Sequence, residues 1–276
     1  MPKELKHYIK EADEMIKLDV PRNAMNDKMD AMDHVDWVPP EELLEIDWWR
    51  ATPSKDPHDA LRTGTNVLSA QKEAITLLPL AANVETKQTA NDNERVLAWI
   101  MAQVNRRRQG TVQKSVVKSA LKFDEVCGLV IDVDEQIKNK KVIEADTKRL
   151  EASKRFGRFA VEIYHPNNVH VQYSNLMPEV VLLHQERPAK EVVDEWGNLA
   201  GEKLKKAAKN DEKVKYYYWQ DYEDTVVWTT DKSGGDEEEI VREEHKLPFL
   251  PWVARVGGDT MESEQKHRRR PLLYAI

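Results

Sequence analysis

The 276-residue sequence is poor in residues on which several classes of protein depend. Its one cysteine, Cys127, excludes an intrachain disulfide framework and a zinc site built on several thiolates. Glycine, with 10 residues, has about half of its usual frequency of roughly 7%, which leaves little room for a glycine-rich phosphate loop. No apolar run approaches the roughly 18 residues of a transmembrane helix. We therefore expect a soluble, intracellular protein without covalent cross-links.

Charge is abundant, but its balance is acidic. Charged residues make up 33% of the chain, and the formal net charge is −7, from 49 acidic and 42 basic residues. A protein that grips nucleic acid mainly through its phosphates usually carries the opposite sign. The apolar fraction of 40%, with 8 Trp and 8 Tyr, is too high for a disordered chain. The composition favours a folded protein that touches DNA, if at all, through a local basic patch.

Residues 1–66 are charge-dense at first and then irregular. Residues 1–36 are dense in charge and read as a mobile or partner-dependent arm. In residues 37–66 several prolines accompany Trp37, Trp48 and Trp49, a mixture suited to a strap that follows a surface and anchors by its indoles. We therefore predict an extended N-terminal arm and strap over residues 1–66.

Residues 67–126 are predicted to be helical. Asn91-Asp92-Asn93 offers capping side chains. One apolar face follows at helical spacing, made of Val96, Leu97, Ile100, Met101 and Val104. Gln109-Gly110 predicts a break, after which Val116 to Leu121 repeats the helical spacing. The pattern indicates a helix, a basic turn and a second helix.

From Cys127 onward the apolar period changes to two, which is typical of strands. Alternation marks residues 129–134, 159–164 and 169–173, and two aromatic-rich strands flank a turn at Asp221–Asp224. The sequence therefore predicts the α+β class, with helices first and a mainly antiparallel, wing-like β-rich domain over residues 127–276.

The search for catalytic motifs finds no phosphate-binding loop, nucleophile elbow or HExxH metal site. For His165 and His170, which flank a Pro-Asn-Asn turn, we favour a structural role over metal ligation. Asp132, Asp134 and Glu135 at a strand end leave a metal-dependent nuclease open as an alternative. Cys127 reads as a small buried hydrophobe. We expect no enzyme activity, no cofactor and no metal.

Two runs of three arginines are the candidate contact sites. Guanidinium groups suit both phosphates and the carboxylates of a neighbouring subunit, whereas a solvated turn is the simplest explanation of such a run. A DNA-binding adaptor that acts through the first run is a further alternative. The residues are Arg106, Arg107 and Arg108, and Arg268, Arg269 and Arg270.

A series of motifs from about residue 48 to the end carries a family resemblance. It comprises "WRATPSKDPHDA" with a later Gly64, "NRRRQG" leading into "SVVKSALKFDEVCGLVIDV", "YHPNNVHVQYS", "YYYWQD…VVW" and "HKLPFLPWVARVGG" before "RRRPLLYAI". In this order the chain resembles the N-terminal half of the portal (head–tail connector) proteins of tailed bacteriophages.

The resemblance implies a structural protein that forms a homo-oligomeric ring, commonly of twelve subunits, at one vertex of a virion capsid. It also implies passage of double-stranded DNA through the ring during genome packaging, and docking of the terminase large subunit, the major capsid protein and head–tail connector proteins. Exposed aromatics, among them Trp37, Trp48, Trp49, Tyr216 and Tyr218, would serve subunit contacts. Members of that family continue into tunnel-lining helices and a crown, so we expect the β-rich domain to continue past Ile276.

Overall fold

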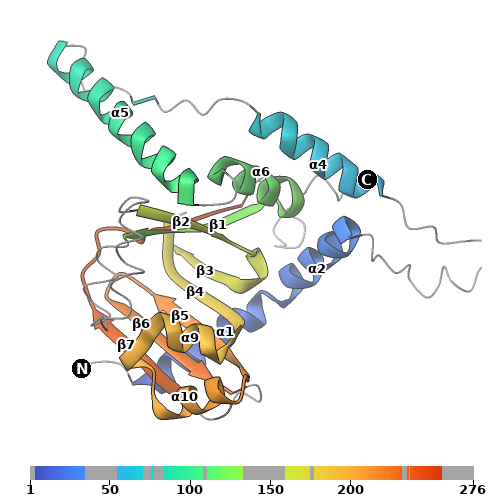
Figure 1. Cartoon of the computed structure of the whole chain (residues 1–276), viewed down its shortest axis with the longest axis vertical. Coiled ribbons are helices and arrows are strands. Elements are labelled where there is room, and N and C mark those ends of the chain that lie inside the picture. Colours follow the sequence, from blue (N-terminus) through green and yellow to red (C-terminus); the bar gives the residue numbers. More distant parts are fainter. Residues whose placement is uncertain are drawn as a thin grey trace, which may run out of the picture.

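The structure is a computed structural model, which describes residues 4–34, 55–70, 76–77, 84–107, 111–132, 159–174, 177–231, 235 and 237–256. The described residues form helices followed by two antiparallel sheets, so the predicted α+β class is confirmed (Figure 1). None of the helices in these ranges is long and apolar enough to cross a membrane.

The larger sheet has five strands in the order β3-β4-β5-β6-β7, which follows the chain. Its strands are β3 (Val169–Ser174), β4 (Met177–Pro188), β5 (Lys213–Gln220), β6 (Asp224–Thr230) and β7 (Glu238–Glu244). The turn predicted at Asp221–Asp224 is present, because the Asp221 carboxylate accepts hydrogen bonds from the backbone N–H groups of Glu223 and Asp224. Tyr217 pairs with Trp228 across the hairpin, with stacked rings 5.0 Å apart.

The smaller sheet has the order β2-β1-β8, from β1 (Glu125–Asp132), β2 (Phe159–Tyr164) and β8 (Trp252–Val256). One face carries Cys127, Leu129, Trp252 and Ala254, which join the main core together with side chains of the larger sheet. The short helices α9 (Ala189–Trp196) and α10 (Glu202–Lys209) contribute Val192, Trp196 and Leu204 to the same core. Trp252 also donates a hydrogen bond to Gln220 of β5, 2.9 Å away.

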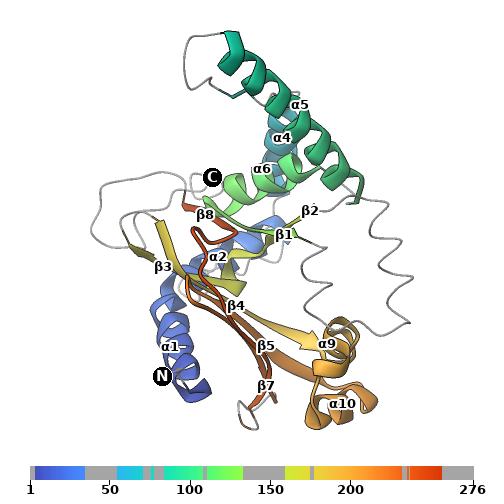
Figure 2. The ribbon, with the colours of Figure 1, turned by 90° about the vertical axis from the view of Figure 1, so that its left-hand side faces the viewer.

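The opposite face of the larger sheet is covered by the N-terminal helix. This helix, α1 (Leu5–Leu18), buries Tyr8, Ala12 and Met15 against a second core cluster on strands β4, β5 and β6. The Tyr8 hydroxyl donates a 2.6 Å hydrogen bond to Asp224. The expected mobile arm is therefore wrong for residues 5–34, which form α1 and α2 (Val20–His34) on the body of the protein (Figure 2).

Three further helices precede the sheets: α4 (Asp56–Ser69), α5 (Val84–Arg107) and α6 (Val112–Phe123). The predicted break between two helices is confirmed, because α5 ends before Gln109 and α6 begins after Gly110. Thr111 caps α6, its side chain accepting a hydrogen bond from the Lys114 N–H. The predicted cap at Asn91-Asp92-Asn93 is wrong, since these residues lie inside α5, which begins seven residues earlier.

Several predictions fall outside the described residues. Among them are the three tryptophans of the expected strap, Trp37, Trp48 and Trp49. The same applies to the chain beyond Val256.

Candidate functional site

A line of polar side chains, which starts at the residue before α2 and continues along this helix, contacts the strands and helices that follow in the chain. We call it the polar stripe; its members are Asp19, Arg22, Asn26, Asp30 and Asp33. Their spacing of three and four residues places them on one helical face. Four of the five are buried, Asp30 being half-buried.

The first half of the polar stripe fastens α2 to strands β1 and β3. Arg22 donates a hydrogen bond to the Val169 carbonyl at 2.9 Å and lies 3.6 Å from a Glu125 carboxylate oxygen. Asp19 lies 3.0 Å from the same guanidinium and 2.7 Å from Nδ1 of His170, whose side chain is 1% exposed. A buried arginine is thereby surrounded by two carboxylates and a carbonyl, which is the pairing that a buried charge requires.

The second half of the polar stripe fastens α2 to α4, to α6 and to the turn before β3. Lys122 Nζ lies 2.6 Å from a carboxylate oxygen of Asp30 and 2.6 Å from one of Asp33. Asp33 also meets Nδ1 of His58, and Asp30 meets Nε2 of His165. Burial alone would raise the pKa of Asp33, but hydrogen bonds from Lys122 and His58 outweigh it and hold this pKa below its ordinary value.

Both histidines of the Pro-Asn-Asn turn therefore face carboxylates of the N-terminal helices. Asn167 within this turn accepts a hydrogen bond from Asn26 and donates one to Asp27. No group of three or more potential ligands for a metal ion occurs among the described residues. The contacts assign His165 and His170 to the packing of α2 on the sheet.

Of the three carboxylates proposed for a nuclease, the structure describes only Asp132. Asp132 is the last residue of β1, where it pairs with Phe159, whereas Asp134 and Glu135 lie outside the described residues. Cys127 is fully buried, as predicted, with its sulfur 3.7 Å from Glu125 Oε1.

The arginine runs are likewise described only in part. Arg106 is exposed in the last turn of α5, and Arg107 is the final residue of that helix. Arg108 and the second run, Arg268, Arg269 and Arg270, lie outside the described residues. The structure thus places one candidate guanidinium, that of Arg106, at the surface.

Helix α5 extends away from both sheets (Figures 1 and 2). Of the predicted apolar face, Val104 is buried near β2, whereas Val96 and Leu97 are exposed. Trp99, which was not part of that predicted face, is 60% exposed. We call Val96, Leu97 and Trp99 the α5 apolar surface.

Two aromatics expected at the surface lie elsewhere. Tyr216 is buried, only 2% exposed, under the guanidinium of Arg187, which lies 5.0 Å from its ring. Tyr218 is half-buried and packs at the edge of the main core. The expectation that Tyr216 is exposed is wrong because its strand faces the core formed with α9 and α10.

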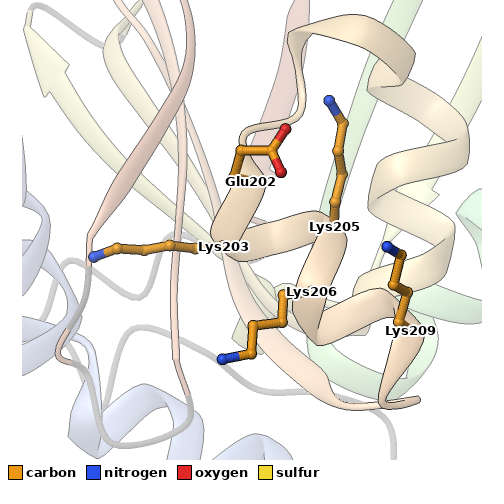
Figure 3. A pocket seen from close by; sticks show the side chains of 5 residues that line it. All are labelled: Glu202, Lys203, Lys205, Lys206 and Lys209. Atoms are coloured by element: carbon orange, nitrogen blue, oxygen red, sulfur yellow. The ribbon is translucent and has the colours of Figure 1, made fainter.

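A cluster of lysines on α10 was missed in the sequence. The helix turns Leu204, Ala207 and Ala208 toward the main core, and Lys203, Lys205, Lys206 and Lys209 occupy its outward arc with Glu202 (Figure 3). These five residues line a shallow hollow of about 390 Å³. The cluster could have been found from the helical spacing of Leu204, Ala207 and Ala208, because these apolar residues mark the buried face of the helix and so place the lysines on its exposed face.

Comparison with known proteins adds no family assignment: no protein-family model matches the chain, and no curated protein matches it significantly.

Proposed function

We propose that the protein is a portal subunit, a structural and non-enzymatic component that assembles into a ring at a capsid vertex. The observation that carries the proposal is the α5 apolar surface on a helix that extends from the body. Exposed apolar side chains that include a tryptophan are typical of protein–protein interfaces. The family resemblance of the sequence motifs supplies the occupant, a second copy of this chain.

The length of α5 suits such a contact. Its 24 residues span about 36 Å at 1.5 Å per residue, which is long enough to reach well onto a neighbouring subunit. A head-to-tail contact of this kind closes into a ring of n subunits when each neighbour is rotated by one nth of a full turn with no rise along the axis. In the ring, double-stranded DNA would pass through the channel, and the terminase large subunit, capsid protein and head–tail connector would dock on its outer faces.

The test is the mass of the full chain in solution, measured by light scattering and native mass spectrometry. We expect a cyclic oligomer for the wild type and a monomer for the triple variant Val96→Gln, Leu97→Gln, Trp99→Gln. The circular dichroism spectrum of that variant should match that of the wild type, because the three side chains are already exposed in the single chain.

A matched control removes three exposed apolar side chains elsewhere, in the variant Leu18→Gln, Val20→Gln, Tyr173→Gln. This variant should keep the ring. A wild type that is monomeric across the micromolar range, or a ring that survives the α5 substitutions, would contradict the proposal.

A further inference from the structure

Helix α10 concentrates positive charge in a protein that is acidic as a whole. Four of its eight residues are lysines, and the formal net charge of the chain is −7. Lys203, Lys206 and Lys209 are exposed, and Lys205 is half-buried. Within the described part of the chain, no carboxylate lies within ion-pair distance of Lys205, Lys206 or Lys209, although Glu202 precedes Lys206 by one helical turn.

Part of this arrangement is unfavourable for the helix. Lys205 and Lys209 are four residues apart, and Lys203 and Lys206 are three apart, so like charges face each other on neighbouring turns. The dipole of the helix favours Lys206 and Lys209 near its C-terminal end, but it disfavours Lys203 near the N-terminal end. An anionic ligand would relieve this repulsion.

The chemistry of the outward arc indicates which anion fits. Protein interfaces are anchored by aromatic, Met and Arg side chains and are depleted in lysine. The arc holds no aromatic or large apolar side chain, because Leu204 is buried in the core. Phosphates, by contrast, are bound by flexible lysine ammonium groups acting as point charges, and release of counterions drives the association.

We propose that the α10 lysines contact the phosphate backbone of nucleic acid. The site lies at the opposite end of the molecule from α5 (Figures 1 and 2), so its use does not depend on the α5 contact. The four side chains spread from the helix over the hollow rather than converging on one point (Figure 3). Such a spread suits successive phosphates of a strand better than a single small anion.

The test is fluorescence anisotropy of a labelled 30-base-pair duplex titrated with the full chain at several salt concentrations. With up to four phosphates neutralised, the slope of log K against log salt reaches about −3.6, so affinity should fall by up to about 150-fold between 50 and 200 mM salt. The variant in which all four α10 lysines are changed to Gln should lose most of this binding and most of the slope. Glu202→Gln, which removes the one negative charge of the arc, should bind more tightly than the wild type.

The matched control changes four exposed lysines of α1 and α2 to Gln, namely Lys6, Lys10, Lys17 and Lys28. It carries the same total charge as the α10 variant and should keep wild-type affinity within about threefold. Equal losses of duplex affinity in the two variants would show an effect of net charge alone and would overturn the proposal. Unchanged duplex affinity of the α10 variant would overturn it as well. Equal binding of poly-glutamate and the duplex would also overturn it, in favour of an acidic protein partner.

The monomeric α5 variant separates this inference from the proposed ring. If the α10 lysines contact phosphates, that variant still binds the duplex at low salt, with a loss of avidity only. The variant with all four α10 lysines changed to Gln should melt close to the wild-type temperature, because it removes like-charge pairs from an exposed helical face.

Discussion

The buried pair of Asp33 and Lys122 offers the sharpest test of how the N-terminal helices are held. The two side chains are 3% and 5% exposed, and their charged atoms lie 2.6 Å apart. Removing one partner of a buried ion pair costs about 3–5 kcal/mol, because the other charge stays buried without compensation. Lys122 keeps a second carboxylate, that of Asp30, so we expect Asp33→Asn to lower the free energy of unfolding by only about 2–3 kcal/mol.

The assay is urea unfolding at pH 7 and a fixed protein concentration, followed by circular dichroism. Asp33→Asn and Lys122→Met should each lower the midpoint without changing the slope. The double variant Asp33→Asn, Lys122→Met should be destabilised by about 1–3 kcal/mol less than the sum of the two single variants, because neither member of the Asp33–Lys122 pair is then left buried without the other. Asp59→Asn, which breaks an exposed pair with Arg62, is the control and should change stability by less than about 1 kcal/mol.

The pH dependence of the same variant gives a second readout. Because the pKa of Asp33 is lowered in the folded protein, its contribution to stability is present above the ordinary value of 3.8 and is lost as the pH falls below it. The difference between the wild type and Asp33→Asn should therefore narrow below about pH 3.8. A loss of less than about 1 kcal/mol for Asp33→Asn at pH 7, with additive single variants, would refute this account of the polar stripe.

Three further predictions concern other parts of the molecule. Burial, with a smaller repulsion from His170, lowers the pKa of His184 to about 4. The free energy of unfolding should therefore fall as the pH drops from 6.5 toward 4. An NMR titration that placed the pKa of this ring near 6.5 would contradict the structure. Changing Asp132 and Asp134 to Asn should alter stability modestly and remove no activity; Mg²⁺- or Mn²⁺-dependent DNA cleavage lost in this variant would favour the nuclease alternative. If Arg106, Arg107 and Arg108 lie at the subunit contact, replacing them with Ser should weaken ring assembly at raised salt and hardly change the melting temperature of the monomer. Native mass spectrometry at two salt concentrations is the measurement. An unchanged ring at both concentrations would show that the three arginines form a solvated turn.

The β-rich half of the fold could be predicted because its signals are local. Strands β5 and β6 carry aromatic residues on either side of an acidic turn, and both the strands and the turn are present. The helix break before α6 could be predicted for the same reason, from Gln109-Gly110. Which aromatics are exposed could not be predicted, since burial of Tyr216 depends on α9 and α10 packing over its strand.

Helix α2 could not be predicted because its inner face is polar. Hydrophobic periodicity treats charged residues as solvated, yet Asp19, Arg22 and Asp33 are buried. Their helical spacing is present in the sequence, but their partners come from residues about 90 to 150 positions away, such as Lys122 and His170. A pattern of charges indicates a buried face only when those distant partners are known.

The polar stripe serves folding and the α5 apolar surface is proposed to serve assembly, so experiments can separate the two roles. Contacts of the polar stripe are satisfied within one chain, so their loss should reduce folding stability whatever the assembly state. The α5 apolar surface is exposed in the single chain, so its loss should change assembly and leave monomer folding intact. A variant of the polar stripe that abolished the ring at full folding stability would therefore show that α2, rather than α5, carries the subunit contact.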